Sequence, residues 1–230
     1  MLESVWDNAA QKQLGRLSRA ETQPVQPFNE LLSSERRSLL QDFWQPPDDV
    51  PRREFMFKSH AQLNDEAFLK LANDLKQNAL VKHLIASHNS LSFSEFSKAG
   101  VMDLLKTNHE IGWLVFGHNE IRDEGALVLA EALRENRGAK HLVLSHNYIA
   151  DDGLVALLDA ILAHPVLESL FIAHNSLGST ALEHCKHFLE SLPPDSSFKR
   201  LDLSGHSFSD YTLLTRLKDL CQRRGVRLIL

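Results

Sequence analysis

A short phrase that recurs at nearly constant intervals constrains this chain more than any other feature. The phrase consists of three apolar residues, a small residue, His and Asn, and its clear copies begin 30, 28 and 28 positions apart. Two weaker copies, residues 55–60 and 201–206, flank them, and our alignment places a His in the Asn position of both. A period of this length is typical of solenoid repeat proteins. The four clear copies are residues 84–89, 114–119, 142–147 and 170–175.

Three of the phrases are followed by a pair of acidic residues and then by apolar residues at helical spacing. After residues 142–147, for example, Asp151 and Asp152 precede Leu154, Leu157 and Leu158. Carboxylates at the start of such a stretch favour a helix N-terminus, where they can bind free N–H groups. Each repeat therefore predicts a short strand, an Asn-containing turn and a helix of about three to four turns.

The pattern LxLxxNxL followed by an acidic helix start resembles the leucine-rich repeats of the ribonuclease-inhibitor type. The resemblance covers residues 52–230 and implies an α/β solenoid, a right-handed β-α superhelix with a parallel sheet on its concave face and helices on its convex face. Such units stack because one repeat alone cannot bury its apolar face. We therefore expect a leucine-rich-repeat domain over residues 51–230, with six repeats and a terminal strand.

Residues 1–50 carry no copy of the phrase. Val5, Trp6, Leu14 and Leu17 suggest one helix, and a second apolar segment ends with Phe43 and Trp44. We interpret this region as a helical N-terminal cap over the first repeat, because terminal repeats expose an apolar edge. A separate docking helix is the alternative.

Two lines of repeated side chains are candidate structural or functional features. The Asn line should form a structural ladder, since an Asn amide can satisfy backbone groups freed at the strand ends. For the adjacent His row we favour a tolerated repeat position over a pH-responsive row or a metal site, because no carboxylate or thiolate completes a ligand set. The ladder comprises Asn89, Asn119, Asn147 and Asn175, and the row comprises His88, His118, His146 and His174.

Composition and motifs exclude several classes of function. A formal net charge of -5 argues against a nucleic-acid binder. No apolar run approaches the roughly 20 residues of a membrane span, and the N-terminus lacks signal-peptide features. We therefore expect a cytoplasmic protein, with signal-less export into a host cell left open. No phosphate-binding, nucleophile or metal-ligand motif occurs, so we expect no enzyme, cofactor or metal site.

The strand register places one set of side chains on the concave face. Its central column is apolar in five of six repeats, which is unusual for a solvated sheet face and indicates a partner surface. We favour an external protein partner over self-association, and either over intramolecular cover by the amino-terminal segment. The predicted partner-binding residues are Met56, His83, Ile85, Trp113, Val115, His141, Val143, Phe171, Arg200 and Asp202.

We therefore interpret the chain as a non-enzymatic protein-protein interaction scaffold that binds a protein partner through its concave face. Repeats of this type also resemble those of the activator of the Ran GTPase, which makes a regulator of a small GTPase the alternative. A bacterial effector that acts on a host protein is a further alternative, because some proteins of this repeat class are delivered into host cells.

Overall fold

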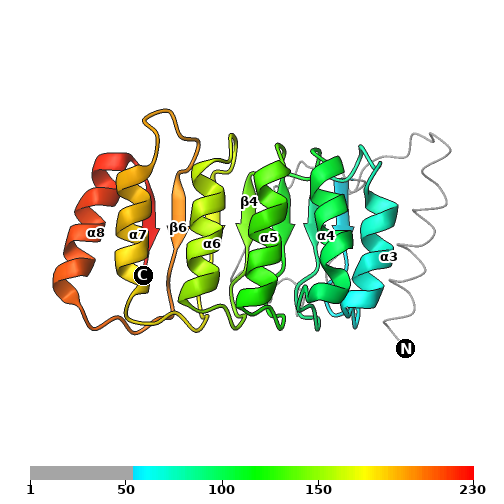
Figure 1. Ribbon diagram of the computed structural model, residues 1–230, viewed down its shortest axis with the longest axis horizontal. Coiled ribbons are helices and arrows are strands. Elements are labelled where there is room, and N and C mark those ends of the chain that lie inside the picture. The colour runs from blue at the N-terminus through cyan, green and yellow to red at the C-terminus, as the bar shows by residue number, and fades with distance from the viewer. Residues whose placement is uncertain (1–53) are drawn as a thin grey trace, which may run out of the picture.

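The computed structural model describes residues 54–230, which form a solenoid of alternating strands and helices. Seven parallel strands lie side by side in sequence order, and the helices cover one face of the sheet (Figure 1). This arrangement confirms the predicted α/β leucine-rich-repeat solenoid. The predicted cap, residues 1–50, lies outside the described residues. The described elements are β1 (Phe55–Phe57), α3 (Asp65–Leu75), β2 (His83–Ile85), α4 (Glu95–Thr107), β3 (Trp113–Val115), α5 (Asp123–Glu135), β4 (His141–Val143), α6 (Asp151–Leu162), β5 (Ser169–Phe171), α7 (Ala181–Ser191), β6 (Arg200–Asp202), α8 (Tyr211–Arg224) and β7 (Arg227–Ile229).

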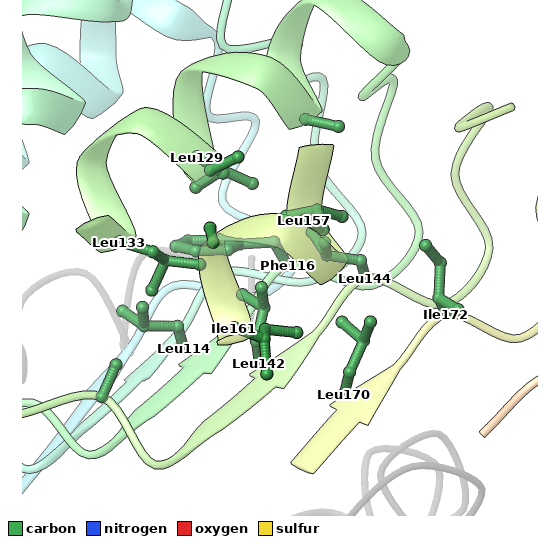
Figure 2. Packing of buried hydrophobic residues seen from close by; sticks show 14 of the residues in the cluster. Leu114, Phe116, Leu129, Leu133, Leu142, Leu144, Leu157, Ile161, Leu170 and Ile172 are labelled. Atoms are coloured by element: carbon green, nitrogen blue, oxygen red, sulfur yellow. The ribbon is translucent and has the colours of Figure 1, made fainter. Parts of the chain in front are cut away.

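The main core lies between the sheet and the helices. The middle residue of each inner strand points toward the helices, and Leu84, Leu114, Leu142 and Leu170 have no exposed surface. Figure 2 shows Leu142 and Leu144 beneath Leu157 and Ile161 of α6. Each repeat thus buries its apolar residues against its own helix and against the next repeat.

The register of β1 differs from the sequence alignment by one residue. Met56 pairs with Leu84, so its side chain belongs to the main core, and Phe57 pairs with Ile85 on the opposite face. The prediction that Met56 belongs to the concave column is therefore wrong. His60 accordingly takes the His position of its repeat and stacks on His88, with ring centroids 4.3 Å apart. Only the outer copy at His206 carries a His in the Asn position.

The Asn ladder joins neighbouring repeats through backbone groups. The Asn147 side-chain oxygen accepts a hydrogen bond from the Ile121 N–H at 3.0 Å. Its side-chain nitrogen donates to the Phe116 carbonyl at 3.0 Å and to the Leu144 carbonyl at 2.9 Å. His206 replaces this arrangement at the carboxyl-terminal end, where its Nε2 accepts from the Asn175 N–H at 3.0 Å. The ladder therefore links adjacent turns as well as completing each turn.

Asn147→Ala is expected to lower the free energy of unfolding by about 1–3 kcal/mol, because it leaves buried backbone groups unpaired. Urea unfolding followed by circular dichroism measures the loss. Tyr148→Ala, next to it and 54% exposed, is the control and should change little. Equal stability of Asn147→Ala and the wild type would show that water replaces the ladder without cost.

A second ladder follows the helix C-termini, and the sequence analysis missed it. Asn136 donates to the carbonyls of Leu105 and Asn108 at 2.6 and 3.1 Å and accepts from the Ala139 N–H at 2.7 Å. Asn108 makes the corresponding bonds one repeat earlier. In the next repeat His164 accepts from the Leu167 N–H at 3.1 Å, but its buried Nε2 has no hydrogen-bond partner among the described residues.

His164→Asn is expected to stabilise the protein by about 1 kcal/mol, because an Asn can donate the hydrogen bonds that Nε2 does not make. The reverse change, Asn136→His, should destabilise it and serves as the matched comparison. Thermal melts at pH 7.5 measure both effects. A lower melting temperature for His164→Asn would mean that the imidazole fills space that an amide leaves empty.

Carboxylates at the helix starts also connect repeats. The sequence suggested that each would bind the N–H groups of its own helix, but two of them bind the following repeat. Asp123 does not bind its own helix but accepts from the N–H groups of Ala150 and Gly153, at 2.7 and 3.1 Å, at the start of α6. Asp65 likewise binds the Ser92 and Ser94 N–H groups of the following repeat. Burial alone would raise the pKa of Asp65, but these bonds and those from the two hydroxyl groups lower it overall.

Candidate partner-binding face

The sheet face opposite the helices is built from the first and third residues of each strand, since alternate side chains point to opposite faces. Nine of the ten predicted partner-binding residues occupy these positions, and Met56 is the exception. Phe55 and Phe57 also lie on this face and were missed in the sequence. The signal that could have found them is that Met56 precedes Leu84 by the same interval at which Leu114 precedes Leu142. The third-position row, as we call it, consists of Phe57, Ile85, Val115, Val143, Phe171 and Asp202.

The third-position row is apolar from β1 to β5 and becomes charged at Asp202 in β6. Ile85 and Val143 have no exposed surface, and Val115 is 2% exposed. With Phe55, Phe57, Trp113 and Phe171 these side chains form an apolar cluster separate from the main core. The expectation of an apolar column on this face is thus met for β2 to β5, but its side chains are buried.

The first strand positions form a second line beside this row. From β1 to β4 this first-position line carries aromatic or imidazole rings, those of Phe55, His83, Trp113 and His141. The His83 ring stacks on Phe55 at 4.4 Å, and Trp113 lies 3.8 Å from His141, measured between ring centroids. Between β5 and β6 the Arg200 guanidinium lies 4.8 Å from the centre of the Phe171 ring. Such stacking fixes the orientations of the rings.

Burial keeps the imidazoles of this line neutral at physiological pH. It lowers the pKa of both His83 and His141 to about 4; the charges of Lys140 and Arg200 make a smaller contribution for His141. The positive charge on this part of the face therefore comes from Arg200. Within residues 54–230, the buried atoms His141 Nδ1 and Arg200 Nε have no hydrogen-bond partner. Unpaired buried polar atoms are rare in native proteins, and here they lie within the predicted binding face.

The His row, extended at its start by His60, forms a continuous stack along the edge of the face. Consecutive ring centroids from His60 to His174 are 4.0 to 4.3 Å apart. Each of these five residues has a left-handed backbone, with φ between 50° and 55°, at the turn that follows its strand. Burial lowers the pKa of His88 to about 4, with smaller contributions from His60 and His146. The row is thus a position defined by backbone geometry that His fills five times.

The described residues contain no group of three or more His, Cys, Asp or Glu side chains arranged to hold a metal ion. Cys185 of α7 and Cys221 of α8 are buried free thiols, and burial raises the pKa of both, to about 11 for Cys221. Among α3 to α8, no helix has the length and apolar character needed to cross a bilayer.

A comparison with protein families agrees with the repeat architecture. A family model described as Leucine Rich repeat matches residues 114–130 and 140–158, which run from β3 into α5 and from β4 into α6. No match was found among curated protein sequences. Among 56 matching solved chains, Leiomodin-1 Actin-Binding Site 2 is 15% identical, with 76% of this chain and 82% of that chain covered and a TM-score of 0.45. The matched repeats and the seven parallel strands show that residues 54–230 have the fold of a leucine-rich-repeat solenoid.

Proposed function

We propose that the chain is a non-enzymatic interaction scaffold whose concave face binds a protein partner, and that its repeats are of the ribonuclease-inhibitor type. The observation that carries the proposal is the third-position row, which is apolar over five neighbouring strands and bordered by stacked rings. A sheet face that serves only to contact water would carry polar side chains here. The length of the repeats and the full helix in each of them support the subtype.

The face also indicates the chemistry of the partner. Its apolar part ends at Arg200 and Asp202, where Arg200 Nε lacks an acceptor among the described residues. A segment with apolar side chains that ends in a carboxylate or a backbone carbonyl would fill the row and satisfy that N–H. Such an acceptor would bind Arg200 more strongly than a neutral pair because the hydrogen bond is charge-assisted.

Affinity capture with matched variants tests this function. The wild type and Leu127→Ala, altered at an exposed residue of helix α5, should retain the same partner, whereas Trp113→Ala should lose it. Binding of the captured protein, measured by calorimetry, should weaken by about 30-fold or more, as expected for a central aromatic anchor. A partner that Trp113→Ala retains and Leu127→Ala loses would place the binding surface on the helices. Light scattering shows whether the partner is a second copy of the chain.

A further inference from the structure

Basic residues gather at one end of this otherwise acidic solenoid. Residues 199–230 contain seven Lys and Arg against three Asp, whereas residues 54–198 contain 11 Lys and Arg against 19 Asp and Glu. The basic stretch comprises β6, α8 and β7, which lie together at one end of the solenoid (Figure 1). This end therefore carries a local positive potential, although the whole chain has a formal net charge of -5.

Two arginines of this end lie directly opposite each other on the concave face. Arg200 is the first residue of β6 and pairs with Arg227, the first residue of β7. Since neighbouring strands are about 4.8 Å apart, the two side chains leave the sheet side by side. Like charges at opposed strand positions repel each other and destabilise a sheet. The folded chain thus holds two cations together at a cost in stability, which an anion bound between them would remove.

The described residues provide no carboxylate that neutralises this pair. Within residues 54–230, neither Arg200 nor Arg227 forms an ion pair. Asp202, on the same strand as Arg200, already accepts hydrogen bonds from the N–H and the hydroxyl group of Ser204, at 3.0 and 2.8 Å. Arg224, by contrast, donates to two backbone carbonyls at the end of α7. The two opposed arginines are therefore the cations of this end that are placed to receive an external anion on the concave face.

An aromatic ring orients one of the two guanidinium groups for a ligand. The Arg200 guanidinium lies 4.8 Å from the centre of the Phe171 ring, and this cation–π contact leaves the N–H groups at its edge available to an acceptor. Arg227 is exposed and can turn toward the same acceptor. A carboxylate fits this arrangement, because each guanidinium can donate to one of its oxygens. A long polyanion such as nucleic acid fits it less well, because the acidic residues 54–198 would repel it.

We propose that Arg200 and Arg227 together bind a carboxylate, that of an Asp or Glu side chain in the segment of the partner that lies on the concave face. The carboxylate site follows from the strand register and from the charges at this end of the solenoid. That the carboxylate belongs to a protein rests on the proposed function.

NMR spectroscopy of the full-length chain with a small dicarboxylate tests the site. At low ionic strength, glutarate should shift the Nε–Hε signals of Arg200 and Arg227 saturably, whereas the uncharged glutaramide should shift neither. Arg227→Gln should weaken glutarate binding by about 10-fold or more, because it removes one of the two charged donors. Arg216→Gln, which alters an exposed cation of α8, is the matched control and should leave the binding unchanged.

Three outcomes of this titration would overturn the proposal. The first is that glutaramide reproduces the shifts, which would mean that charge is not recognised. The second is that Arg227→Gln binds glutarate as well as the wild type does. The third is that inorganic phosphate binds more tightly than glutarate, which would assign the site to a phosphorylated ligand.

Thermal melts measure the repulsion between the two arginines independently. Arg227→Glu converts the like-charged pair into an opposite pair and should raise the melting temperature by about 1–3 °C, whereas Arg216→Glu should not. Glutarate should raise the melting temperature of the wild type but not that of Arg227→Glu. An unchanged or lower melting temperature for Arg227→Glu would show that the arginines do not repel each other and would overturn the proposal. Neither measurement uses a partner, so the proposed binding function is decided separately by Trp113→Ala.

Discussion

Acidification from pH 7 to pH 4.5 is expected to lower the melting temperature of this protein strongly. His83, His88, His141 and His164 each have a pKa lowered to about 4, mainly by burial. The unfolded chain therefore binds protons first as the pH falls below about 6.5. The stability that depends on these imidazoles staying neutral is fully present above that pH and is progressively lost toward pH 4. His83 and His164 are the most buried of the four. At pH 4.5 each should lower the free energy of unfolding by about 2 kcal/mol, and the other two should lower it by less.

A loss of this size is comparable with the whole stability of many domains, about 5–15 kcal/mol. Circular dichroism melts at constant ionic strength, in steps from pH 7.5 to 4.5, measure it. His83→Gln combined with His164→Asn should flatten the dependence, whereas His118→Gln with His146→Gln tests the stacked row alone. A melting temperature that stays constant to pH 5 would contradict the lowered pKa values. A slope that only the row variant removes would identify the row as the pH-sensitive element.

The sequence predicted those features that follow directly from the repeat period. Recurrence of the phrase aligns β2 to β6, places Leu142 toward the helices and Val143 away from them, and puts Asn147 at a turn. The same period also contained the second ladder, since Asn78, Asn108 and Asn136 each stand at the same distance in sequence before a strand. It was missed because side chains after a helix look like ordinary connecting residues until their partners in the previous repeat are known.

Two other features depend on contacts that periodicity does not specify. In β1 all three residues are apolar, so alternation could not distinguish the inward Met56 from the outward Phe57. The repeat pattern also predicts which face of the sheet the Val115 and Val143 side chains point to, but it does not predict how deeply they are buried. A side chain that points away from the helices can still be buried, and its burial depends on segments distant in sequence.

Leu144→Ala is expected to lower the free energy of unfolding by about 2–5 kcal/mol, because it opens a cavity in a core that cannot fully close. Leu144 has no exposed surface and lies between the sheet and α6 (Figure 2). Urea unfolding measures this loss, which should be the same with or without a binding partner. Trp113→Ala is the comparison, because its ring is partly exposed on the concave face and stacks on His141.

Loss of that stacking should cost only about 1 kcal/mol of stability, while the loss of partner affinity should be larger. The two substitutions therefore separate folding from recognition: Leu144→Ala should weaken the fold and, where it remains folded, bind normally, whereas Trp113→Ala should remain folded and bind poorly. If Trp113→Ala instead destabilises the chain as much as Leu144→Ala does, the concave face is part of the folding core. In that case any partner would have to bind elsewhere.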